Sequence, residues 1–102
     1  MNKYINLLLA VFIIMTVDVT AYTPFECGGN RVTASGAHCV EGITCALNGV
    51  PFGSKVIWKG QTYTVHDRCG YDNVLDIFVE SRDRAFQIGR TRSVDIEVIL
   101  PE

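Results

Sequence analysis

Residues 66–78 read HDRCGYDNVLDIF, and this stretch decides how the rest of the chain is interpreted. Two short apolar runs meet here: Asp67 follows the first run, Gly70 marks a turn, and Asp76 lies inside the second run. A carboxylate within an apolar strand is costly unless it is paired or used. Asp76 is therefore the leading candidate for a functional residue. The alternative is a structural role, in which Asp76 caps the turn or pairs with Arg68.

Outward from this stretch, apolar and polar residues alternate in short segments. They predict six strands, at residues 17–23, 42–47, 54–58, 62–66, 74–79 and 93–100. Residues 59–60 predict a hairpin turn, and residues 25–36, rich in glycine and polar residues, predict a loop. Ser81 predicts the N-cap of a short helix that runs to about Ile88 and ends at Gly89. Six short strands and one helix, without repeats, predict one mainly β domain folded as a compact barrel.

Residues 1–21 have the pattern of an export signal. Lys3 precedes an apolar run at residues 5–17, and small residues at 19–21 suit a signal peptidase. The apolar run is shorter than the roughly 20 residues that span a bilayer. The first expected strand overlaps this segment, so the boundary of the leader lies within 16–21. Either cleavage falls earlier, near Thr16–Asp18, or the leader stays as a signal anchor. We expect export to the periplasm, cell wall or extracellular space, with membrane contact only through an uncleaved leader.

Four cysteines, Cys27, Cys39, Cys45 and Cys69, predict two disulfides in a small exported domain. Three connectivities are possible; the six-residue spacing favours Cys39–Cys45, which leaves Cys27–Cys69. The chain has no C-x-x-C pair, so neither zinc nor another cofactor is expected. The net charge of −2, with scattered basic residues, gives no nucleic-acid footprint. We expect a monomer.

Five short motifs follow one another along the chain: Thr33-Ala34-Ser35-Gly36, Val50-Pro51-Phe52-Gly53-Ser54, Asp67-Arg68, Leu75-Asp76-Ile77, and Ala85-Phe86 with Gly89. In order and spacing they resemble the 3D domain, which is named for its three aspartates, and the related RlpA-like domain of bacterial cell-wall proteins. The likeness covers nearly all of the chain after the leader. It implies a six-stranded double-psi β-barrel over residues 19–102.

Both families include lytic transglycosylases, lyases that cleave MurNAc–GlcNAc bonds of peptidoglycan. The resemblance implies that Asp76 is the catalytic acid and Asp67 the aspartate beside it in the groove. One acid suffices in such an enzyme, because the substrate's own C6 hydroxyl attacks the anomeric carbon and gives a 1,6-anhydro-muramyl end. Burial of Asp76 and the like charge of Asp67 should raise the pKa of Asp76, as a general acid needs.

Further residues are expected to contact the glycan strand. Tyr22 and Tyr71 could stack on sugar rings, and the other expected contacts are Thr33, Ser35, Arg68 and Asp72. Arg68 has a structural alternative, which is to fix the loop beside Asp67.

Two departures from the families define the alternative function. Leu47 stands where active RlpA-like enzymes carry a histidine, and Asn48 stands where 3D domains carry their first aspartate. The cysteines are similar to those of expansins, barrels that loosen cell walls without cutting glycans. The alternative is therefore a non-catalytic, expansin-like wall-binding module. A small secreted inhibitor or defence-type barrel is a third class that the fold allows.

Overall fold

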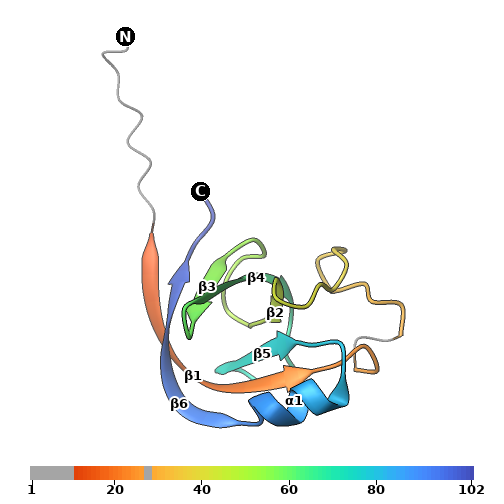
Figure 1. Ribbon diagram of the computed structural model, residues 1–102. Coiled ribbons are helices and arrows are strands. Elements are labelled where there is room, and N and C mark those ends of the chain that lie inside the picture. The colour runs from red at the N-terminus through yellow and green to blue at the C-terminus, as the bar shows by residue number, and fades with distance from the viewer. Residues whose placement is uncertain (1–10, 27–28) are drawn as a thin grey trace.

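Alternating apolar residues close six strands into a barrel in the part of the chain that the computed structural model describes, residues 11–26 and 29–102 (Figure 1). The elements are β1 (Phe12–Tyr22), β2 (Thr44–Ala46), β3 (Lys55–Trp58), β4 (Gln61–Asp67), β5 (Val74–Phe78), α1 (Arg82–Ile88) and β6 (Thr91–Ile99). The order around the barrel is β1-β5-β2-β4-β3-β6. This closed barrel with one short helix confirms the predicted fold class.

The strands pair in a mixed pattern that brings distant parts of the sequence together. β1 runs parallel to β5 and antiparallel to β6, while β2 runs parallel to β4 and antiparallel to β5. β3 closes the barrel between β4 and β6. The short β2 therefore lies between the two strands that carry the stretch of residues 66–78.

The inward-facing residues of every strand form one apolar core. The fully or almost fully buried members are Val17, Val19, Cys45, Leu47, Val56, Val65, Leu75, Ile77, Val79, Ile96 and Val98. Since successive side chains of a strand point to opposite faces, the residues between them face outward. Thr16, Asp18 and Thr20 of β1, and Asp76 of β5, are on that outer face.

Local signals in the sequence predicted the hairpin and the helix correctly. β3 and β4 are joined at residues 59–60 and pair in register from Lys55↔Thr64 to Trp58↔Gln61. The Ser81 side chain caps α1 by accepting a hydrogen bond from the backbone N–H of Arg84. Over residues 11–26 and 29–102, the structure has no helix that is both long and apolar enough to cross a membrane.

β1 begins five residues earlier than the sequence predicted. Residues Phe12 to Val17 pair with β6, from Phe12↔Ile99 to Val17↔Val94. The sequence hid this part of the strand because residues 11–15 are all apolar, so no alternation marks it. Val17 and Val19 are 2% and 0% exposed, which means that a cut after Ala21 would remove part of the core.

The predicted Cys39–Cys45 disulfide is wrong. Cys45 points into the barrel core, and no disulfide joins it to Cys39. Cys39 lies in a second apolar cluster, on the opposite face of β2, with Tyr22, Ala46 and Phe78. Six residues of spacing could have allowed a bridge, but Cys45 points into the barrel core while Cys39, in a loop, packs against the outer face of β2.

The predicted Cys27–Cys69 disulfide is also not formed. Cys27 lies outside the described residues. The Cys69 thiol instead donates to the backbone carbonyls of Ala46 and Val74, at 3.3 and 3.2 Å. Burial raises the pKa of Cys69 to about 12, so this thiol is not activated as a nucleophile.

Candidate functional site

Strand register places the two candidate aspartates on either side of a small residue. Thr20 of β1 is paired with Asp76 of β5, and Asp76 is paired with Ala46 of β2. Ala46 is in turn paired with Asp67 at the end of β4. With strands about 4.8 Å apart, the Cα atoms of Asp67 and Asp76 are roughly 10 Å from each other. The short side chain of Ala46 leaves an opening between them.

This opening is part of a cavity of about 350 Å³, which we call the acidic cleft. Its size is within the usual range for ligand sites in proteins. Three carboxylates and one guanidinium face it, so its charge is predominantly negative. The lining residues are Thr20, Ala21, Tyr22, Glu26, Ala46, Asp67, Arg68, Cys69, Gly70 and Asp76.

Asp76 is a partly buried carboxyl with one direct side-chain donor. The Thr20 hydroxyl donates to Asp76 Oδ1 at 2.8 Å. The pKa of Asp76 is raised to about 6. Burial is the main cause of the rise, the Thr20 hydrogen bond opposes it, and the negative charges of Glu26 and Asp67 add to it. A carboxyl with this pKa is protonated in a substantial fraction of molecules at mildly acidic pH, as proton donation requires.

Asp67 is held in one orientation by three donors. Tyr22 Oη donates to Asp67 Oδ2 at 3.2 Å, and the backbone N–H groups of Ala34 and Arg68 donate to Oδ1 at 3.0 and 2.9 Å. Such a ring of donors suits a carboxylate that keeps its position while a ligand binds. Tyr22 therefore lines the cleft as a hydrogen-bond donor to Asp67.

The Arg68 side chain has a structural role, as one alternative predicted. It contacts Leu47 and Phe52, whereas the prediction was a pair with Asp67. Its Nη1 atom donates to the backbone carbonyl of Leu47 at 2.8 Å. The guanidinium lies over the Phe52 ring, 3.9 Å from the ring centroid. These contacts hold the guanidinium at the wall of the acidic cleft.

Thr33 and Ser35 lie behind Asp67, outside the set of residues that line the acidic cleft. The Thr33 hydroxyl donates to the Ala37 carbonyl at 2.8 Å, and the backbone N–H of Ser35 donates to the His66 carbonyl at 3.0 Å. These bonds shape the loop that presents the Ala34 N–H to Asp67. A direct contact of either residue with a substrate stays a prediction.

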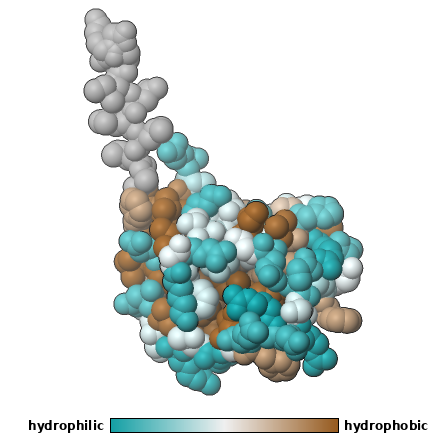
Figure 2. Space-filling view, in the orientation of Figure 1, coloured by the Kyte–Doolittle hydropathy of each residue, from teal (hydrophilic) through white to brown (hydrophobic). Residues whose placement is uncertain are grey.

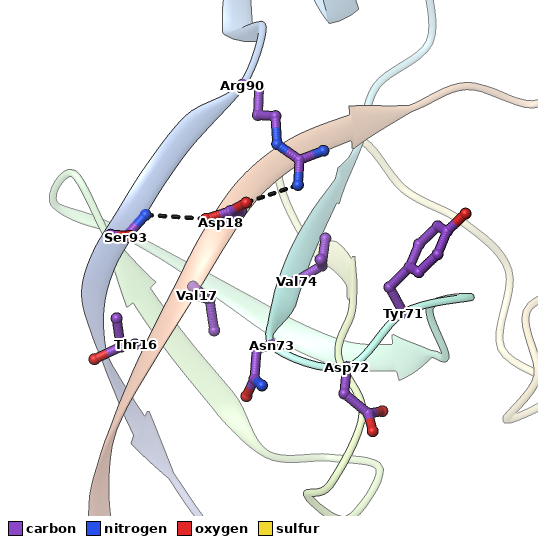
Figure 3. Close-up of a pocket in the computed structure, with 9 residues that line it drawn as sticks. All are labelled: Thr16, Val17, Asp18, Tyr71, Asp72, Asn73, Val74, Arg90 and Ser93. Carbon is purple, nitrogen blue, oxygen red and sulfur yellow. Dashed lines mark hydrogen bonds and ion pairs between the residues drawn. The ribbon is translucent and has the colours of Figure 1, made fainter.

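Tyr71 and Asp72 line a neighbouring cavity of about 550 Å³ (Figure 3). The other lining residues are Thr16, Val17, Asp18, Asn73, Val74, Arg90 and Ser93. We call this space the second cavity. The two predicted substrate contacts are thus brought near the acidic cleft but not into it.

The structure explains the two departures at residues 47 and 48. Leu47 is fully buried in the core. Asn48 holds the loop between the two cavities: its Nδ2 donates to the Cys69 carbonyl and to Asp72 Oδ1, both at 3.0 Å, and its Oδ1 accepts the Cys69 N–H at 2.9 Å. Asn48 is therefore a structural clamp.

The sequence interpretation missed Thr20 and Glu26. Thr20 was treated as part of a cleavage site, and only the β1–β5 pairing reveals its contact with Asp76. Glu26 is bound through Oε2 by the backbone N–H and the hydroxyl of Thr23. The Thr-x-x-Glu spacing, typical of reciprocal capping contacts, was the local signal that could have indicated an ordered carboxylate here.

No protein-family model matches this chain, and no curated protein sequence matches it either. The interpretation of the site consequently rests on its geometry and chemistry.

Proposed function

We propose that the protein is an exported lytic transglycosylase that cleaves peptidoglycan with Asp76 as its single catalytic acid. The observation that supports this function most is the state of Asp76, a carboxyl whose pKa is raised to about 6 and which opens into a cleft of ligand size. Raised carboxyl pKa values are typical of general acids in glycoside cleavage. The motifs around Asp67 and Asp76 support the same family of reactions.

In the proposed reaction, Asp76 first donates its proton to the glycosidic oxygen while the bond from that oxygen to C1 breaks. The sugar ring then carries positive charge spread over C1 and the ring oxygen. The C6 hydroxyl attacks C1, and its proton passes to the Asp76 carboxylate, which restores the acid. The products are a 1,6-anhydro-muramyl end and a free C4 hydroxyl on the departing sugar.

The other carboxylates of the acidic cleft have an electrostatic task in this scheme. Asp67 and Glu26 place negative charge where the ring becomes positive, which stabilises the transition state more than the ground state. Their charges also raise the pKa of Asp76. Fixing Asp67 through three donors means that little reorganisation is needed when the charge develops.

The alternative is an expansin-like module that binds wall glycans in the same cleft and breaks no bond. It is favoured by the core position of Leu47 and by the commitment of Asn48 to the loop, since neither can then take part in chemistry. A hydrolase is a further possibility to test. Asp72 faces the second cavity, so Asp67 or Glu26 would have to activate the water.

The test is to incubate purified protein with isolated peptidoglycan and to identify the released fragments by mass spectrometry. We expect 1,6-anhydro-muramyl products, and Asp76→Asn should lower their rate of release by about 10²–10⁴-fold, because the amide cannot exchange a proton. Asp67→Asn should lower the rate less. Asp83→Asn, which removes an exposed carboxylate on α1, is the matched control and should retain the wild-type rate.

Other products would reject this function in a defined way. Binding to insoluble wall without new anhydro ends, equal in wild type and Asp76→Asn, would support the expansin-like module. Reducing ends without the anhydro ring would support a hydrolase.

A further inference from the structure

The acidic cleft and the second cavity lie along the same outer face of β1 and β5. Thr16, Asp18 and Thr20 alternate with core residues on β1, so all three point outward. Asp18 is paired with Val74 just as Thr20 is paired with Asp76. Two residues of strand separate these pairs, which is about 7 Å. A ligand that extends from Asp76 along β1 therefore enters the second cavity.

One loop borders both spaces. Its residues Cys69 and Gly70 line the acidic cleft, and Tyr71 and the next three residues line the second cavity. Asn48 holds this loop from behind, and the Asp18 N–H donates to the Asn73 carbonyl at 3.0 Å. The shared wall is thus fixed to the barrel at several points, which lowers the ordering cost of binding.

The charges that face the second cavity are already matched by protein partners. Arg90 Nη2 lies 2.6 Å from Asp18 Oδ2 (Figure 3). Arg92 Nη1 lies 3.7 Å from the same oxygen. The backbone N–H of Ser93 also donates to Asp18, at 3.0 Å. Asp72 accepts from Asn48. Asp72 keeps its negative charge, because the Asn48 amide is neutral, and this charge offsets the second cation, Arg92. Since two carboxylates and two guanidinium groups balance in sum, the cavity favours an uncharged ligand over an ion.

The remaining lining groups suit a carbohydrate. The Tyr71 side chain is 78% exposed, so one apolar ring face is open to a ligand. The Asn73 amide and the Asp72 carboxylate, which line the same cavity, offer hydrogen-bond donors and acceptors (Figure 3). The Thr16 hydroxyl already donates to Asp95 Oδ1 at 2.6 Å. A pyranose presents the complementary surface, with hydroxyl groups at its rim and C–H groups on its faces.

We propose that the second cavity is a subsite that holds the continuation of the glycan strand bound over Asp76, with Tyr71 as its stacking platform. This inference rests on the proposed function, because it takes a glycan in the acidic cleft as its starting point. It makes the protein selective for strands long enough to fill both spaces, rather than for short fragments.

The test compares glycan fragments of two lengths: single disaccharides and strands of four or more disaccharides, both prepared from peptidoglycan. Binding is measured by calorimetry in the Asp76→Asn background, where cleavage is expected to be too slow to disturb the measurement. Adding Tyr71→Ala should weaken binding of the long strands by roughly 5- to 30-fold and leave binding of the disaccharide unchanged. Ile43→Ala, another exposed apolar side chain that lines neither cavity, is the control and should change neither value.

A second measurement does not depend on the Tyr71 substitution. The ring-proton resonances of Tyr71 should shift on titration with long strands and stay in place with the disaccharide. Equal binding of long strands with and without Tyr71→Ala, together with unmoved ring resonances, would overturn the second subsite and leave the proposed function standing. If neither length binds, the glycan function itself fails, and the subsite fails with it.

Discussion

At the scale of single residues, burial of the Asp76 carboxylate lowers the free energy of unfolding whenever that group is ionised. Its pKa is about 6 in the folded protein and roughly 3.9 in an unfolded chain. Below about pH 4 the group is protonated in both states and has no effect on stability. As the pH rises towards 6, the unfolded chain loses this proton first, so the free energy of unfolding falls. Above that range the full destabilisation, about 2–3 kcal/mol, is present.

Asp76→Asn should therefore stabilise the protein at pH 7 by about 2 kcal/mol and have little effect near pH 4. The amide has no charge to desolvate, so the pH dependence contributed by this position disappears. Urea unfolding of wild type and variant at pH 4, 5 and 7 measures the difference. Asp83→Asn should show no such trend. An equal stability difference at pH 4 and pH 7 would contradict the burial argument.

Thr20 tunes this same carboxyl. Its hydroxyl donates to Asp76 Oδ1 and so favours the charged form. In Thr20→Val the pKa of Asp76 should rise above its present value of about 6, and the alkaline limb of the pH–rate profile for anhydro-product release should move to higher pH. Carbon NMR titration of the Asp76 carboxyl gives the pKa directly. Thr62→Val, on the β3–β4 hairpin, is the matched control, and an unshifted limb in Thr20→Val would reject the tuning role.

At the scale of elements, the sequence of β1 has to supply core residues and also overlaps the predicted export signal. Its second half supplies Val17 and Val19 to the core, and its first half lies in the apolar run that was predicted as an export signal. Apolar side chains remain exposed on that first half, at Val11, Phe12 and Ile14, and Figure 2 shows apolar atoms gathered where β1 leaves the barrel. A cut after residue 21 would remove Val17 and Val19 from the core, so we expect it to disrupt the fold.

If the protein is exported, as proposed, we expect its folded form to begin before Val17 or to keep residues 1–21. Each buried valine contributes about 1.5–3 kcal/mol, and their joint loss approaches the 5–15 kcal/mol that stabilises a typical domain. A chain that starts at Tyr22 should not fold, whereas one that starts at Val11 should. N-terminal sequencing of exported protein and circular dichroism of both truncated chains test this. A folded protein that begins at Tyr22 would show that the first strand is dispensable.

The sequence predicted those elements that carry local signals. The turn at residues 59–60, the Ser81 cap and the final strand were all found, because each depends on neighbouring residues. The disulfide pairing failed because the face on which a cysteine lies depends on which strands pair. Both aspartates were found from their motifs. Their separation by Ala46, and the contact of Thr20 with Asp76, come from pairings between residues more than 20 positions apart, which no local pattern encodes.

At the scale of the whole molecule, the barrel places its chemistry on strands instead of on long loops. Four neighbouring strands, β1, β5, β2 and β4, each contribute a residue to the acidic cleft. Strands fixed on both sides by hydrogen bonds hold side chains more precisely than loops do. The acidic cleft thus depends on barrel closure, and a substitution that opens the barrel should abolish the proposed binding and catalysis together.

The pairing of β1 also dictates when the protein can fold. β1 is synthesised first, yet its partners β5 and β6 are synthesised last, and the paired residues Phe12 and Ile99 are 87 positions apart in the sequence (99 minus 12). A chain that emerges from the ribosome holds an unpaired first strand until almost its full length is available. Folding before synthesis is complete is thereby disfavoured, which would suit the proposed export, because a narrow channel accepts only an unfolded chain.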